Sequence, residues 1–151
     1  EQRNFSKLDF KKFHPSGTLG TKLKTAEDLM VIKNKIPLIN ENDSMKIGLR
    51  IISKKALGTL IAQNKKGKTV GIITDGDIKR ANSKYKDINE IKIKDIMSRN
   101  PISIEKNTLA VEALAIMNSK KITGLCVHNK TNYKKTIGFL HIHNILKANI
   151  Q

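Results

Sequence analysis

A stretch of eleven residues occurs twice in this chain, and this repetition restricts the fold more than any other feature of the sequence. Residues 71–81 read GIITDGDIKRA, and residues 138–148 read GFLHIHNILKA. The copies align without a gap, because their first glycines (138 − 71) and their last alanines (148 − 81) are both 67 residues apart. In each copy an apolar run leads into a polar cluster and a helix-like Ile-x-x-Ala, which predicts a strand, a turn and the start of a helix.

The sequence upstream of the first copy predicts the rest of a folding unit. We expect a helix capped by Thr25, an extended segment at 36–39, and a further helix behind a capping signal at 42–44. Met45, Leu49 and Ile52 lie on one face of that second helix. The unit is completed by strands at 58–62 and 70–73, joined by a turn at 64–68, and by a closing helix that begins at or near Asp77.

The second half of the chain is expected to follow the same order. Segments at 95–97 and 101–104 lead to a cap at Asn107-Thr108, and Ala110, Leu114 and Met117 share one face of the next helix. Strands at 124–127 and 137–140 and a closing helix from Asn144 follow. Equivalent residues stay in step, with Met97 − Met30 = 67 and Pro101 − Pro37 = 64. We therefore interpret the chain as one supersecondary unit used twice.

The charge of the chain is strongly positive, with 29 Lys and Arg against 13 Asp and Glu, or +16. The excess is spread out, at +3 (5 − 2) in residues 1–23, +6 (14 − 8) in 24–90 and +7 (10 − 3) in 91–151. The four Phe and two Tyr do not suggest a platform for stacking bases. We expect no specific nucleic-acid partner, and charge alone predicts weak binding of polyanions at low salt.

Other global features narrow the class of protein. An apolar fraction of 38% over 151 residues is compatible with a packed interior. No run approaches the roughly 18 apolar residues of a membrane helix, so we expect no membrane association. The one cysteine, Cys126, lies in the apolar run GLCV and is expected to be a small core residue, which favours the reducing cytoplasm. The chain begins without Met and in the middle of a pattern, which suggests a piece of a longer protein.

These repeated phrases resemble tandem CBS modules. The resemblance covers about residues 24–150 and rests chiefly on GIITDGDIKRA. It implies an α+β fold in which two βαββα modules, 24–90 and 91–151, pack about a pseudo-twofold axis after a connector at 1–23. It also implies two clefts that often bind nucleotides.

The connector resembles one subgroup of this family. Residues 3–23, RNFSKLDFKKFHPSGTLGTKL, are similar to the join between a sugar isomerase domain and a CBS pair in D-arabinose 5-phosphate isomerases, although Ser16 replaces a glycine of that pattern. The phrases DIMSRNP and KKITGLCV also resemble that subgroup. The resemblance makes His14 a candidate catalytic residue of the missing isomerase domain. We expect no isomerase activity from these 151 residues alone, because no phosphate-binding loop or partner base accompanies it.

The resemblance also suggests ligand-binding residues. A Thr and an Asp three positions later commonly hold a ribose in CBS pairs, and Thr74 and Asp77 match that pattern, with Asp75 between them. An alternative is that Asp77 only caps a helix. The equivalent residues of the second module are His141 and Asn144, so two equal adenosine sites are not expected. Pro37, Leu38 and His143 complete the candidate set.

Two histidines need separate consideration. If His141-x-His143 lay on a strand, both rings would point to one face and could bind a metal, but the sequence offers no third ligand. We expect instead that these side chains line a cleft or satisfy hydrogen bonds in a turn, and no metal is predicted.

The sequence thus predicts a regulatory CBS pair of an arabinose 5-phosphate isomerase, which would supply the synthesis of the sugar Kdo. The expected ligand is a nucleotide or a nucleotide-sugar such as CMP-Kdo, and no cofactor is required. An adenine-nucleotide sensor is one alternative. Another is a structural module without a ligand, since the family implies dimers of CBS pairs within a tetrameric parent. In that case Met45, Ile52, Leu114 and Met117 could form an interface instead of a core.

Overall fold

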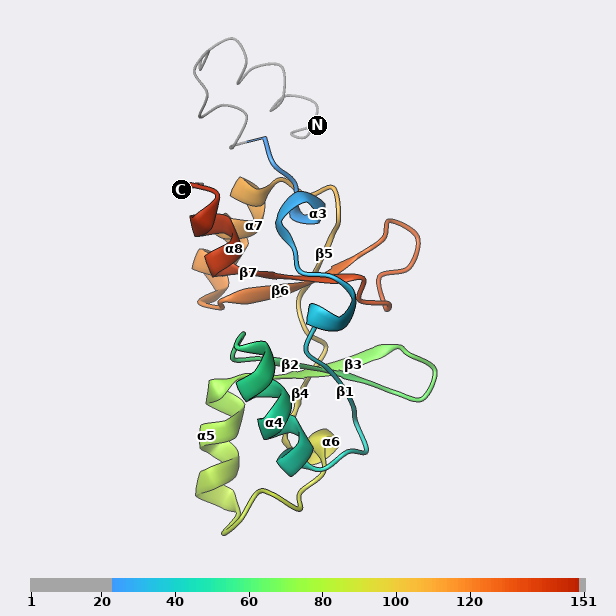
Figure 1. Cartoon of the computed structure of the whole chain (residues 1–151), viewed down its shortest axis with the longest axis vertical. Coiled ribbons are helices and arrows are strands. Elements are labelled where there is room, and N and C mark those ends of the chain that lie inside the picture. The colour runs from blue at the N-terminus through green and yellow to red at the C-terminus, as the bar shows by residue number, and fades with distance from the viewer. Residues whose placement is uncertain (1–22, 150–151) are drawn as a thin grey trace.

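The computed structural model describes residues 23–149, which form two β-sheets stacked between outer layers of helices (Figure 1). The first sheet has the strand order β1 (Leu38–Asn40), β2 (Leu60–Gln63), β3 (Thr69–Ile73) and β4 (Ser98–Arg99). The second has the order β5 (Ser103–Glu105), β6 (Gly124–His128) and β7 (Gly138–His141). In both sheets the first two strands are parallel and the remaining pairs are antiparallel. This confirms the mixed α+β fold with two repeated units.

Helices cover the outer face of each sheet. In Figure 1, α4 (Met45–Lys55), α5 (Asp75–Lys84) and α6 (Ile93–Ile96) lie with the first sheet, and α3 (Ala26–Leu29), α7 (Ala110–Lys120) and α8 (Ile142–Lys147) lie with the second. A short 3-10 helix, η1 (Lys33–Lys35), precedes β1. The predicted helix faces are confirmed, because Met45, Leu114 and Met117 are buried in these layers. Their burial assigns them to the core and leaves them unavailable for an interface with another molecule.

The leading helices of the two repeats are exchanged. Ala26 of α3 is buried in the core of the second repeat, whereas Ile93 and Ile96 of α6 are buried in the core of the first. Two isolated β-bridges, Thr25 to Leu109 and Ser44 to Lys92, fasten these helices in place. Each core is therefore completed by residues from the other repeat.

Two glycines make room for the exchanged segments. A Cβ atom at Gly71 would lie 2.5 Å from the Sδ atom of Met97, and one at Gly138 would overlap the side chain of Met30. The methionines follow α6 and α3 and are 67 residues apart (97 − 30), as the glycines are (138 − 71). The absence of a side chain at these glycines thus lets the exchanged segments lie directly on the sheets.

The two sheets meet along an apolar seam with a polar contact at one end. Ile61 and Phe139 are fully buried there, with Cys126 almost so. The hydroxyl oxygens of Thr69 and Thr136 lie 2.6 Å apart, and the two residues occupy equivalent positions, 67 residues apart (136 − 69). The pseudo-twofold axis therefore passes between these two threonines.

Most predicted elements are present, and the predicted and observed boundaries differ mainly at the ends of the helices. The closing helices begin earlier than expected, at Asp75 and not Asp77, and at Ile142 and not Asn144, because residues 74 and 141 are the N-caps. The cap predicted at Asn107-Thr108 lies one residue later, at Leu109, where the backbone N–H donates to Glu112. The capping boundaries at Thr25 and Ser44 are confirmed.

Two remaining predictions concern the N-terminal segment and membrane association. His14 and the connector up to residue 22 lie outside the described residues. Among residues 23–149, no helix has the length and apolar composition that crossing a membrane requires.

Candidate functional site

A cavity that we call the first cleft lies where the start of α5 faces the second repeat. Its volume is about 440 Å³. It is lined by residues 58–59, 72, 74–77, 98–102 and 121–124. Both repeats, together with the segment 98–102 that joins the two sheets, therefore build one site. Its size suits a small organic ligand.

The start of α5 is held by a buried carboxylate. Asp77 is 4% exposed, and its Oδ2 accepts hydrogen bonds from the Thr74 backbone N–H (2.9 Å) and the Thr74 hydroxyl (3.2 Å). Its Oδ1 accepts from Arg80 Nη2 and from the Ser98 hydroxyl, both at 2.6 Å. Because a carboxylate offers about four acceptor positions, Asp77 is saturated by protein donors.

These bonds decide the protonation of Asp77. Burial raises the pKa of this carboxyl, but the hydrogen bonds from Ser98, from the backbone and hydroxyl of Thr74, and from Arg80 outweigh burial and leave the pKa below its ordinary value of 3.8. Asp77 is consequently an anion at neutral pH. Asp77 does cap the helix, and its carboxylate could bind a ligand as well if one of its present donors were exchanged.

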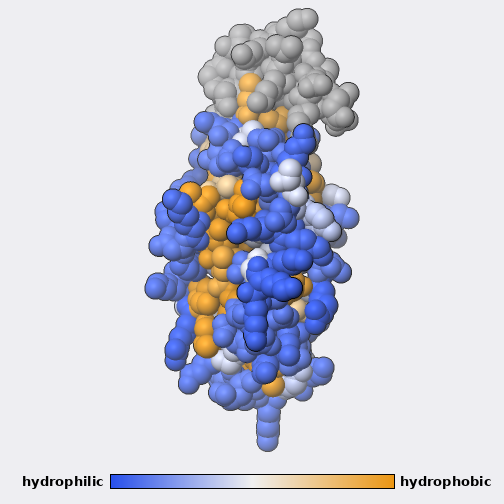
Figure 2. Space-filling view, turned by 90° about the vertical axis from the view of Figure 1, so that its right-hand side faces the viewer, coloured by the Kyte–Doolittle hydropathy of each residue, from blue (hydrophilic) through white to orange (hydrophobic). Residues whose placement is uncertain are grey.

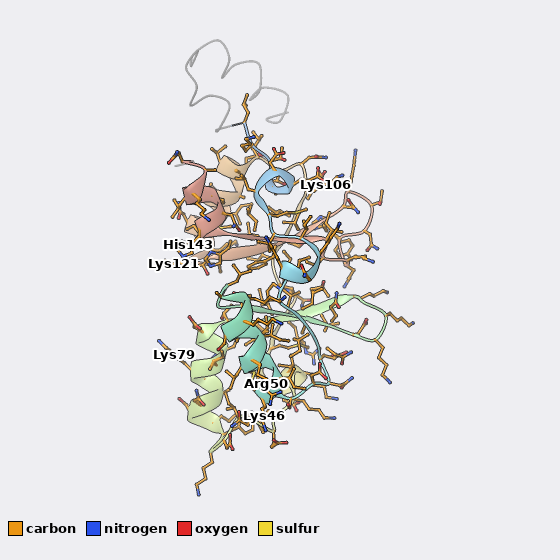
Figure 3. The ribbon with its side chains drawn as sticks, viewed as in Figure 1. Lys46, Arg50, Lys79, Lys106, Lys121 and His143 are labelled. Atoms are coloured by element: carbon orange, nitrogen blue, oxygen red, sulfur yellow. The ribbon has the colours of Figure 1, made fainter. Side chains whose placement is uncertain are left out.

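The cleft also carries cations and apolar surface. Arg99 and Lys121 line it, and Lys121 ends α7 in a left-handed conformation (φ 57°). Figure 3 shows Lys121 on the side of the molecule that carries the helices. Ile102 and Ile122 contribute apolar walls. The arrangement combines a helix N-terminus, two cations, the carboxylates of Asp75 and Asp77 and an apolar surface, which together suit a ligand that carries hydroxyl groups, an anionic group and a flat apolar group.

A second cleft occupies the equivalent position across the pseudo-twofold axis. Its volume is about 360 Å³, and Val31, Asn34, Lys35, Lys54, Lys55 and Leu57 line it. Lys55 and Leu57 correspond to Lys121 and Thr123 of the first cleft, 66 residues later in both cases. The ammonium group of Lys55 donates to the carbonyl of Asn34. No carboxylate lines this cleft, so the two clefts differ in chemistry.

The histidine pair belongs to the start of α8. His141 is the N-cap, 8% exposed, and its Nδ1 accepts from the His143 backbone N–H at 3.1 Å. The His141 backbone N–H donates to Asn144 Oδ1 at 2.9 Å, as Thr74 does to Asp77. Burial, and then the neighbouring His143, lower the pKa of His141 below 6.5. These residues satisfy a helix start, and none of them lines either cleft.

The two histidine rings are stacked, with centroids 4.7 Å apart. His141 ends β7 and His143 lies in α8, so they do not share a strand face as the metal hypothesis required. Within residues 23–149, no three His, Cys, Asp or Glu side chains are grouped so that they could hold a metal ion.

The structure brings together only part of the candidate set. Thr74, Asp75 and Asp77 lie at the first cleft. Pro37 and Leu38 lie at the start of β1, where the Pro37 carbonyl accepts from Ile61 N–H and Leu38 packs in the seam between the sheets. They do not line either cleft.

Sequence reasoning missed residues 98–100, in the segment that joins the two sheets, and residues 121–123, in the loop after α7. Their signal was present, since both lie in phrases, SRNP and KKITG, that the family resemblance included. What the phrases could not show was that these segments face Thr74 across the cleft.

A profile of the CBS domain matches residues 23–84 and 93–150. The chain belongs to the CBS domain family. The two matches correspond to the two repeats, and the fold and the exchanged helices described above are therefore those of a CBS pair.

Curated relatives of this CBS pair include longer proteins. The arabinose 5-phosphate isomerase KdsD of Yersinia pestis is 36% identical over 98% of this chain, and KdsD of Escherichia coli is 33% identical over 98%. An uncharacterized protein of Rickettsia prowazekii, RP505, is 35% identical over 99%. This chain spans only 44–46% of the length of these relatives.

Solved structures confirm the fold. A CBS domain protein named NE2398 superposes with a TM-score of 0.72 at 24% identity, covering 85% of this chain and 98% of that one. CBSX2 in complex with AMP gives 0.71 at 20% identity, covering 83% and 95%. The CBS pair of MJ0100, in complex with 5′-methylthioadenosine and S-adenosyl-L-methionine, gives 0.71 at 24% identity, covering 83% and 94%.

Proposed function

We propose that the first cleft binds a nucleotide or nucleotide-sugar and that this CBS pair regulates a sugar-phosphate isomerase to which it is joined. The observation that carries the proposal is the placement of Thr74 and Asp77, at the start of α5, opposite Lys121 of the other repeat within one cavity of about 440 Å³. A ligand that spans the cavity would contact both repeats. Its binding would then depend on how the repeats are arranged, which is the requirement for a regulatory signal.

The ribose of the ligand would bind at Thr74 and Asp77. Because Asp77 is saturated, a ribose hydroxyl has to replace a protein donor, and Ser98 is the candidate, since its hydroxyl donates to Oδ1 and it lines the cleft. Arg80 also donates to Oδ1 but does not line the cleft, so it can keep its hydrogen bond. The ribose hydroxyl would take the position of the Ser98 hydroxyl on Oδ1 and restore the fourth hydrogen bond.

The rest of the cleft suits the other parts of a nucleotide. The base would lie against the apolar side chains of Ile102 and Ile122, and the phosphate would lie near Arg99 and Lys121. AMP and S-adenosyl-L-methionine accompany two of the similar CBS structures, which supports a nucleotide. CMP-Kdo is a further candidate, because a cytidine ribose and an acidic sugar suit the same groups.

The relation to KdsD proteins supports an isomerase as the larger protein. In that protein the CBS pair would be the regulatory half, and interconversion of D-arabinose 5-phosphate and D-ribulose 5-phosphate would be the activity. An activity assay of the longer protein, with and without the bound nucleotide, tests this part of the proposal. Lack of interconversion would refute the isomerase, independently of nucleotide binding.

Calorimetric titration with AMP, ATP, CMP and CMP-Kdo tests the ligand. We expect one of them to bind, with affinity reduced about tenfold or more by Lys121→Gln, since that change removes a charge-assisted contact. Lys55→Gln is the matched control, because Lys55 is the equivalent residue of the second cleft. Equal losses in the two variants, or no binding of any of the four compounds, would contradict the assignment.

A structural role is the second candidate, and exposed apolar side chains on the helices favour it. Ile47 on α4 is 40% exposed, and Leu146 on α8 is 48% exposed. Lys46 and Arg50 flank Ile47 on the same helix (Figure 3), so a contact between two copies there would bring like charges together. Sedimentation at low and high salt tests this role. Association that strengthens with salt and is lost in Ile47→Glu would support it.

A further inference from the structure

A small polar pocket lies between the two repeats, beside the first cleft, with which it shares Asn100 and Pro101. Its volume is about 140 Å³, and its lining includes Thr69, Asn100, Ser103, Tyr133, Lys134 and Thr136. It is next to the hairpin loops, which project on the side of the molecule that faces the viewer in Figure 2. We call it the hydroxyl pocket, because four of these six side chains carry a hydroxyl group.

The hydroxyl pocket has a rigid floor. Thr136 is 6% exposed, and its hydroxyl is hydrogen-bonded to that of Thr69 at 2.6 Å. The Thr69 backbone N–H donates to the Lys134 carbonyl at 2.8 Å, which ties the loop of the second repeat to the first sheet. The Thr136 hydroxyl is also hydrogen-bonded to the Cys126 thiol, so a proton of the threonine pair is available to a ligand when the thiol is the donor of that bond.

The wall of the pocket is an ordered series of side chains. Ser103 Oγ lies 2.5 Å from His128 Nδ1, and the His128 ring meets the Tyr133 ring edge-on at 6.4 Å. The Lys134 ammonium group lies 5.4 Å from the centroid of the Tyr133 ring. The loop cation is thereby held beside the pocket by a ring contact, although its side chain is exposed.

Two features of the second repeat that help to form this pocket differ from their equivalents in the first repeat. Ser103 pairs with Cys126 in the second sheet, whereas Leu38 pairs with Ile61 at the equivalent place in the first. The pocket-forming loop between β6 and β7 spans residues 129–137, but the loop between β2 and β3 spans only 64–68. The polar substitution and the longer loop together create a site that the repeat symmetry does not require.

The chemistry of the lining favours an anion. It offers hydroxyl groups, the Asn100 amide and the Lys134 ammonium group, and no carboxylate lines it. Its volume is well below the roughly 300 Å³ at which sites for organic ligands begin, yet it holds more than one water molecule. Lys130 and Lys135 in the same loop add positive potential. Glu105, which acts on His128, is a carboxylate outside the lining of the pocket.

We infer that the hydroxyl pocket binds a tetrahedral oxyanion, either free phosphate or the phosphate group of a small phosphorylated molecule. The Lys134 ammonium group would pair with the oxyanion, and Asn100, Ser103 and the Thr69–Thr136 pair would donate hydrogen bonds to its remaining oxygens. Asn100 also lines the first cleft, so this residue of the segment that joins the two sheets forms a wall of both sites.

NMR titration of the intact chain with inorganic phosphate, at ionic strength held constant with chloride, tests the inference. We expect saturable shifts at the amides of residues 69, 100, 102–103 and 133–136, and an affinity reduced about tenfold in Lys134→Gln. Lys135→Gln is the matched control, because Lys135 is the next residue of the same loop and does not line the pocket. Ser103→Ala is a second variant that leaves the charge unchanged, and it should also weaken binding.

Ribose 5-phosphate in a parallel titration distinguishes the two sources of the phosphate group. Tighter binding than inorganic phosphate assigns a phosphorylated molecule, and weaker binding assigns the free ion. Either result supports an oxyanion site. Shifts that do not saturate and are spread over exposed lysines would overturn the inference, as would equal losses in Lys134→Gln and Lys135→Gln. Neither result depends on whether the first cleft binds a nucleotide.

Discussion

Replacing Asp77 tests whether its carboxylate organises the first cleft. In Asp77→Ala, the Thr74 backbone N–H and the Ser98 hydroxyl lose their acceptor in a site where Asp77 is 4% exposed. A hydrogen bond to a charged group contributes about 1.5–3 kcal/mol, and the loss of a helix cap costs about 0.5–2 kcal/mol. The bond from Arg80, which is 72% exposed, adds at most about 1 kcal/mol. We expect Asp77→Ala to lower the free energy of unfolding by about 2–4 kcal/mol.

Asp77→Asn should cost much less, because the second repeat shows that Asn serves at this position. There Asn144 Oδ1 accepts from the His141 backbone N–H at 2.9 Å. An amide at 77 can accept from Thr74 in the same way and donate to the hydroxyl of Ser98, so that only the exposed Arg80 loses its partner. We expect a loss of about 1 kcal/mol.

Denaturant unfolding at neutral and acid pH measures both changes. The folded-state pKa of Asp77 is below 3.8, so its contribution to stability is present above that pH and is lost as the pH falls through the folded-state value. The stability difference between the natural chain and Asp77→Asn should therefore shrink on acidification below about pH 4. Asp75→Asn, at an exposed position of the same helix turn, should show only a small change. Equal costs for Asp77→Asn and Asp77→Ala, or a difference between the natural chain and Asp77→Asn that is independent of pH, would refute the account.

Three further predictions concern other parts of the chain. Gly124→Ala should destabilise the protein by about 1–3 kcal/mol in chemical denaturation, because its Cβ would overlap the ring of Phe139, whereas Gly76→Ala, where the nearest atom would be 3.5 Å away, should be neutral or stabilising. His141→Thr should reduce the loss of stability between pH 7 and pH 5 in thermal melts; the folded-state pKa of His141 is below 6.5, so its neutral form stabilises the fold above that pH and this contribution is lost as the pH falls. Unchanged pH dependence in that variant would contradict the prediction. Cys126, whose pKa burial raises to about 11, should resist a thiol reagent at pH 8 until denaturant is added, and rapid labelling of the folded chain would contradict its burial.

The repeat predicted the fold well because its information is local. Caps, helix faces and hairpins depend on residues within about ten positions of one another, and both copies carried the same signals. Two closing helices began two residues earlier than predicted, because the N-cap residues Thr74 and His141 were read as strand ends. The sequence predicted only the part of the candidate site at the start of α5. The residues that face Thr74 come from the segment 98–102 and from the end of α7, which the sequence could not place beside it.

The exchange of leading helices was not visible in the sequence at all. Apolar residues of α3 and α6 indicate that these segments are buried, but not in which core. The two glycines over which Met30 and Met97 lie do not decide that choice, because both repeats carry them at equivalent positions, so the exchange could be recognised only once the sheets were placed.

The same exchange has a consequence for how such a chain can arise. A first repeat that ended at residue 90 would lack α6, whose residues complete its core. A second repeat that began at residue 91 would likewise lack α3, which completes the core of the second sheet. Two separate copies of a single ancestral repeat could still satisfy every one of these contacts by trading their leading helices as a homodimer. Fusing the two copies into one polypeptide would then have turned an intermolecular contact into an intramolecular one, and would have freed each half to acquire its own cleft.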